Sequence, residues 1–184
     1  MRPFVVLLML ASAASCASSG SSSAGSGIPS PSDRIVASDN QNTYRTTVAP
    51  NAKVPIPAAP DRVFTALKAV YNELGVPAAV DEPATGRVGN TNFFKTRKFG
   101  KESVSTYLNC GNSITGSAAD NYRVYISLIS IVRPDGQGGS ELETSFNAAA
   151  QNMEGTSSDR VVCGTTGRLE EQIRKLVLQK VAAP

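Results

Sequence analysis

The residue types best suited to binding chemistry gather in one short segment, residues 95–101. Its cations are Lys95, Arg97, Lys98 and Lys101, and phenylalanines at positions 93, 94 and 99 are interleaved with them. Cations with aromatic neighbours can bind anionic groups, so this segment is a candidate site for anionic lipid headgroups, a glycan or an acidic protein. The alternative is a solvated hairpin whose phenylalanines reach the core while its charges protect a sheet edge.

Cys110 and Cys163 form a second candidate pair. In an exported, oxidising compartment these two thiols allow a single bridge. A bridge would close a loop of about 54 residues and contribute roughly 4 kcal/mol in the chain-entropy model. A reactive or redox-active thiol pair is the alternative, but the chain has no CxxC motif, no His and no cation cluster near these cysteines. We therefore expect a structural disulfide.

The remaining composition excludes most catalytic chemistry. The chain has 184 residues and no His, so it has no Ser-His-Asp triad, no HExxH zinc site and no imidazole base. We find no calcium-binding or phosphate-cradling loop motif, and we expect the carboxylate pairs at 81–82, 141/143 and 170–171 to be solvated or to favour a helix N-terminus. A formal net charge of +3 is too small to indicate nucleic acid binding. We expect no enzyme activity, no metal and no cofactor.

The first 15 residues have the three-part layout of a secretory signal peptide. Arg2 gives a positive start, residues 4–10 are an unbroken apolar run, and residues 11–15 are small. The apolar run is too short to span a bilayer, which takes about 20 helical residues. We expect residues 1–15 to be removed from the mature protein.

Cys16 follows these small residues directly. The segment Ala13-Ala14-Ser15-Cys16 resembles the lipobox of bacterial lipoproteins, although Ala13 stands where that family usually has Leu. The resemblance implies that Cys16 is diacylated, becomes the first mature residue and holds the protein on the membrane. Because Ala17 is not Asp, the resemblance also points to the outer membrane. Cleavage after Ala13 by an ordinary signal peptidase, which would give a secreted soluble protein, is the competing possibility.

Residues 17–32 are Ser, Gly, Pro and Ala apart from Ile28. Such a composition cannot bury enough apolar surface to offset the entropy of ordering the chain. We therefore predict a lipidated cysteine and flexible tether at 16–32, with a root-mean-square reach of roughly 20–25 Å. A single globular domain is predicted at 33–184.

The spacing of apolar residues predicts two helices in this domain. Residues 59–73 carry an apolar stripe with the helical period, Pro60 fits the first turn and Gly75 suits the C-terminal end. Residues 167–181 carry a second stripe with acidic residues early and basic residues late, which matches the helix dipole.

Strands are predicted at 44–48, 76–80, 87–94, 103–108, 122–132 and 141–150. Residues 53–57 carry two prolines and are predicted to be an extended edge segment at most. Residues 122–132 and 141–150 alternate most clearly and are joined by a Gly-rich turn, so they should form an antiparallel hairpin. Residues 87–94 and 103–108 are predicted as a second hairpin. Because helices and strands are segregated along the chain, we expect an α+β fold: an antiparallel sheet of about five to six strands with two helices on one face.

A sheet that curls around a C-terminal helix is called a helix-grip, and the predicted order is helix-grip-like. This order resembles the repeat domain of BamC-like outer-membrane lipoproteins, on the strength of residues 61–76, Asp81 and the step Thr85-Gly86-Arg87-Val88. The resemblance implies a binding or accessory domain rather than a catalytic one.

These features together predict a non-catalytic lipoprotein of the cell envelope whose domain binds another envelope protein. The alternative is a periplasmic carrier of a small ligand or lipid, with a cavity between the sheet and the C-terminal helix. Small residues such as Ala148–Ala150 would leave room for such a cavity.

Overall fold

The computed structural model of this chain describes residues 32–37, 43–48, 53–154 and 160–183. The predicted signal peptide, Cys16 and the tether up to residue 31 lie outside the described residues. The described chain opens with β1 (Ser32–Ala37) and β2 (Thr43–Val48), which pair antiparallel. The strand predicted at 44–48 is therefore confirmed, and the predicted tether overlaps β1 by one residue, Ser32.

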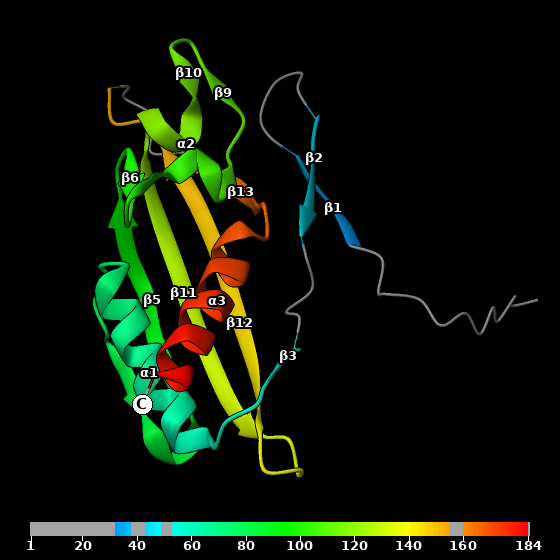
Figure 1. The fold of residues 1–184 in the computed structure, drawn as a ribbon. Coiled ribbons are helices and arrows are strands. Elements are labelled where there is room, and N and C mark those ends of the chain that lie inside the picture. Colours follow the sequence, from blue (N-terminus) through cyan, green and yellow to red (C-terminus); the bar gives the residue numbers. More distant parts are fainter. Residues whose placement is uncertain (1–31, 38–42, 49–52, 155–159, 184) are drawn as a thin grey trace, which may run out of the picture.

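A seven-stranded sheet forms the frame of the domain (Figure 1). Its strands lie in the order β4 (Val80–Glu82), β5 (Arg87–Lys95), β11 (Arg123–Pro134), β12 (Ser140–Gln151), β13 (Arg160–Thr165) and β8 (Leu108–Asn109), and β3 (Lys53–Ile56) also pairs with β12. The β11–β12 pair is the predicted hairpin, and every pairing in the sheet is antiparallel. The α+β class is confirmed, with seven strands where five or six were expected.

Two helices cover one face of this sheet, α1 (Pro60–Glu73) and α3 (Arg168–Ala182), and they also contact each other (Figure 1). Their predicted apolar stripes are buried: Val63, Leu67, Val70, Leu169, Ile173 and Val177. A third helix, α2 (Ala118–Asn121), is short and lies at one end of the sheet. The helix periodicity therefore identified both long helices and the face that each buries.

Two strand predictions are wrong. In the segment 76–80 only Val80 is in a strand. Residues 103–108 do not pair with β5, which lies instead between β4 and β11. They contain a one-turn helix, η2 (Val104–Thr106), because Val104 and Tyr107 are both buried and three residues apart, a spacing that a helical turn satisfies and a strand does not.

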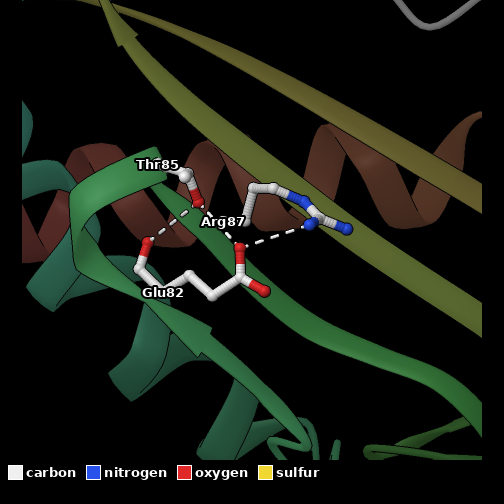
Figure 2. A network of polar contacts seen from close by, with 3 residues as sticks. All are labelled: Glu82, Thr85 and Arg87. Carbon is white, nitrogen blue, oxygen red and sulfur yellow. Dashed lines mark hydrogen bonds and ion pairs between the residues drawn. The ribbon is translucent and has the colours of Figure 1, made fainter.

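The turn between β4 and β5 is held by a polar network centred on Glu82 (Figure 2). One carboxylate oxygen of Glu82 accepts hydrogen bonds from the Thr85 hydroxyl at 2.8 Å and from the Arg87 guanidinium at 3.2 Å. These contacts span the short helix η1 (Pro83–Thr85) and orient the start of β5.

Two glycines let β5 lie against β11. Gly86 has φ 66°, and a Cβ added there would lie 2.1 Å from the carbonyl oxygen of Val132. Gly89 has φ 146°, and a Cβ there would lie 2.1 Å from the carbonyl oxygen of Leu128. At both positions the backbone conformation disfavours a side chain, and the neighbouring strand leaves no space for one.

The core between the sheet and the helices is filled by an aromatic cluster and a short polar chain. The ring of Phe99 makes edge contacts with Phe93, Tyr107 and Phe146, with centroid distances of 5.9, 5.9 and 6.3 Å. The Tyr71 hydroxyl and the Ser130 hydroxyl are 2.6 Å apart, and Ser130 in turn bonds Thr144 at 2.7 Å. Burial raises the pKa of Tyr71, which therefore stays a neutral hydrogen-bonding group.

Candidate binding surface

Lys95 is separated from the other cations of the segment 95–101. Its Nζ donates a 2.8 Å hydrogen bond to the carbonyl oxygen of Gly75, just past the end of α1, and lies 5.4 Å from the ring centroid of Phe99. Burial lowers the pKa of Lys95. A cation on a free carbonyl at a helix C-terminus stabilises that end, so Lys95 has a structural role here.

The other three cations, Arg97, Lys98 and Lys101, are exposed around the hairpin of β6 (Lys98–Phe99) and β7 (Glu102–Ser103). None of the ion pairs between described residues includes them. Phe99 fixes this hairpin by burying its ring in the core. Phe93 and Phe99 reach the core while three cations stay in solvent, as the solvated-hairpin alternative predicted. Binding of an anionic partner by this segment stays a prediction.

Beside this hairpin, β9 (Asn112–Ser113) and β10 (Gly116–Ser117) form a second one that projects past the end of the sheet (Figure 1). Ile114 at its tip is fully exposed, at 105% of its reference area. The Ser113 hydroxyl holds the tip by donating to the carbonyl oxygen of Gly116 at 3.0 Å and accepting from the Asn121 amide at 3.0 Å. Sequence reasoning did not identify Ile114 as a candidate binding residue. The signal for it was a single isoleucine surrounded by Asn, Ser, Thr and Gly, residue types that are common in exposed turns.

Cys110 and Cys163 form a disulfide, with an S–S distance of 2.03 Å. It joins the chain after β8 to β13, where Gly164 and Thr165 pair with Asn109 and Leu108. The bridge therefore fastens the segment that carries both hairpins to the main sheet. Cys16, the predicted lipidation site, lies outside the described residues.

The sheet face opposite α1 and α3 carries a patch of aromatic, aliphatic and arginine side chains. Phe94 pairs with Tyr125 on β11, and Val162 on β13 continues the same row across Ala149. Phe94 is 57% and Val162 48% exposed. We call Phe94, Arg123, Tyr125, Arg160 and Val162 the sheet-face patch.

Both arginines of the sheet-face patch lie over its rings. The Arg160 guanidinium carbon is 3.9 Å from the ring centroid of Tyr125, and that of Arg123 is 5.0 Å from the ring centroid of Phe94. Neither arginine belongs to an ion pair between described residues. The patch is therefore apolar with two cations that have no carboxylate partner in the described chain.

The other end of this face is electrostatically balanced. Arg133 bonds Glu143 at 2.6 Å, and Lys53 lies 3.4 Å from Glu141. Adjacent to them, Arg87 bonds Glu82. The carboxylates at 82, 141 and 143 are thus in ion pairs. The sheet-face patch differs from this end, because its two arginines have no carboxylate partner among the described residues.

Surface grooves between described residues are open to solvent. One of about 650 Å³ runs along the outer side of α3 and is lined by residues that include Glu102, Arg168, Gln172 and Lys175. Two others flank α1. The space between the sheet and α3 is instead occupied by buried side chains such as Phe99, Phe146 and Ile173, which favours binding at a surface over binding in an enclosed cavity.

Within the described ranges, no group of three or more His, Cys, Asp or Glu residues is placed to hold a metal ion. Among the helices described, none combines the length and apolar character required to cross a membrane.

Comparisons with protein-family models, with curated proteins and with solved structures find no match to this chain.

Proposed function

We propose that this chain is a non-catalytic lipoprotein of the cell envelope, anchored through acylated Cys16 in the outer membrane, whose domain binds a protein partner. The observation that carries the binding role is the sheet-face patch, an exposed apolar row with two arginines that lack carboxylate partners among the described residues. Tyrosine and arginine are the residue types most enriched at the energetic centres of protein interfaces.

The side chains of the sheet-face patch indicate what kind of partner it would bind. An apolar side chain of the partner would pack beside Phe94 and Val162, and a carboxylate would pair with Arg160. The stacking of Arg160 on Tyr125 at 3.9 Å holds its guanidinium in place before binding, which reduces the entropy lost on association. We therefore propose an acidic partner with an exposed apolar contact residue.

Two features support this reading over a carrier or a cytoplasmic protein. The buried aromatic cluster occupies the space where a carrier would hold its ligand. The Cys110–Cys163 disulfide fits an oxidising compartment outside the cytoplasm.

The anchor is tested by replacing Cys16 with alanine. We expect the wild-type protein in the membrane fraction and the Cys16→Ala protein in the soluble or unprocessed fraction, because a multi-acylated cysteine holds stably while one chain alone is marginal. Mass spectrometry of the wild-type N-terminus should find acyl groups on Cys16. A Cys16→Ala protein that stays with the membrane at wild-type level would exclude the lipid anchor.

The binding surface is tested with a photocrosslinking residue at Val162 in the otherwise intact chain. We expect one discrete crosslinked partner in envelope membranes, and an Arg160→Glu change in the same chain should reduce its yield about tenfold, since loss of a central interface arginine weakens binding strongly. The matched control places the crosslinker at Gln137, which is exposed in the turn after β11. Equal yields at both positions, or no response to Arg160→Glu, would contradict the assignment.

A further inference from the structure

The β6–β7 and β9–β10 hairpins carry exposed cations and an exposed isoleucine that are not part of the sheet-face patch. We define the loop end as Arg97, Lys98 and Lys101 on the β6–β7 hairpin together with Ile114 at the tip of the β9–β10 hairpin. These hairpins lie at the same end of the sheet, and the β9–β10 tip projects beyond the β6–β7 hairpin (Figure 1). The exposed apolar tip of the β9–β10 hairpin thus extends farther from the sheet than the hairpin that carries the exposed cations.

The cations of the loop end make no ion pair. None of the ion pairs between described residues includes Arg97, Lys98 or Lys101. The nearby acids are Asp120, which accepts the Ser105 backbone N–H at 2.9 Å, and Glu102 on β7. The three cations outnumber these two acids, so the loop end has a small excess of positive charge.

The apolar character of the domain surface is also concentrated at this end. Among residues 53–154 and 160–183, whose exposure is described, the exposed large hydrophobic residues are Phe94, Ile114, Met153 and Val162. Met153 follows the end of β12 that pairs with the start of β11, next to α2, so it lies at the loop end too. The opposite end of the sheet carries ion pairs instead, such as Arg133 with Glu143.

We propose that the loop end docks onto an anionic lipid surface, with Ile114 entering the interface and Arg97, Lys98 and Lys101 contacting headgroups. A projecting single-residue tip offers too little area for a stable protein interface, which buries about 800 Å² on each partner. An apolar tip beside a few cations suits a membrane surface, where the inserted side chain and the cations each add to the affinity. Each cation near an anionic membrane surface raises the affinity about fivefold.

The role of this contact rests on the proposed function, because an acylated Cys16 would hold the domain near a bilayer at high effective concentration. Weak contacts of the loop end would then suffice to orient the domain. A bilayer bound at the loop end would meet the end of the sheet where the β9–β10 hairpin lies, and the long strands β11 and β12 would extend away from the membrane (Figure 1).

The test uses residues 16–184 with Cys16→Ala, so that no acyl chain contributes to binding. We expect this protein to co-sediment with vesicles of phosphatidylglycerol and phosphatidylcholine, and not with phosphatidylcholine alone. Lys98→Glu with Lys101→Glu should weaken binding by about 30-fold or more. Ile114→Asn should weaken it by about tenfold, through loss of apolar burial, and added salt should weaken it further.

The matched control is Lys53→Glu with Lys68→Glu, which makes the same change in charge at exposed positions on β3 and α1. We expect less than about a twofold effect there, because those sites lie away from the loop end. Absence of vesicle binding, or binding unaffected by the loop-end changes, would overturn the proposal; binding to an acidic protein without vesicle binding would assign the surface to a protein partner. The lipid anchor is tested independently of vesicle binding, because mass spectrometry of the wild-type protein would then find no acyl groups on Cys16 if the anchor proposal is wrong.

Discussion

Replacing Phe99 with alanine is expected to lower the free energy of unfolding by about 3–5 kcal/mol, the range found when a buried aromatic side chain is truncated. Phe99 is fully buried, and its ring contacts Phe93, Tyr107 and Phe146 from three separate segments of the chain. Chemical denaturation of the purified protein measures the change. At about 2–4 °C per kcal/mol for a chain of this size, the melting temperature should fall by roughly 10 °C.

Phe94 supplies the control, because it has the same side chain on the same stretch of chain and is mostly exposed. Phe94→Ala should change the free energy of unfolding by less than about 0.5 kcal/mol. If both variants lost equal stability, the division of this segment into a buried and an exposed aromatic would be wrong. Phe99→Ala should also weaken vesicle binding in the unacylated chain, since the β6–β7 hairpin loses the residue that fixes it.

Removal of the disulfide is the second large effect. Cys110→Ala with Cys163→Ala should lower the free energy of unfolding by about 4 kcal/mol, because the bridge restricts the unfolded chain over a long loop. Denaturation under non-reducing conditions measures the loss. The same loss is expected when a reductant is added to the wild-type protein.

The reductant also provides the internal control for this experiment. It should have no effect on the double alanine variant, which has no bridge left to break. A wild-type protein whose unfolding midpoint ignores the reductant, or which shows two free thiols without reduction, would contradict a structural disulfide.

The long elements of this fold were predictable because each repeats one local pattern. The stripe containing Val63 and Leu67 required a helix, and the strict alternation through residues 122–132 required a strand with one buried face. The segment from Glu102 to Asn109 was not predictable in this way, because it changes from strand to one-turn helix to strand within a few residues. β13 was missed for a related reason, since its six residues carry no alternation of buried and exposed positions.

The candidate sites show the same limit at the level of single side chains. Composition grouped Lys95 with Arg97, Lys98 and Lys101. The direction of a side chain depends on its strand and its neighbours, however, and Lys95 bonds the carbonyl oxygen of Gly75. The sheet-face patch joins Phe94, Tyr125 and Val162 from three strands, so it depends on a register that the sequence alone could not supply. The disulfide was predictable because two cysteines permit one bridge.

The paired glycines at the start of β5, Gly86 just before it and Gly89 within it, give a way to recognise distant relatives of this chain. Gly86 and Gly89 each lie where a side chain would meet a carbonyl oxygen of β11 at 2.1 Å. Surface residues, loop lengths and even the sheet-face patch can diverge without altering the fold, but these two positions cannot accept a Cβ. A Gly-x-x-Gly pattern at the start of a strand, after a helix and a short acidic turn, is therefore a fingerprint that can survive after overall sequence similarity has been lost.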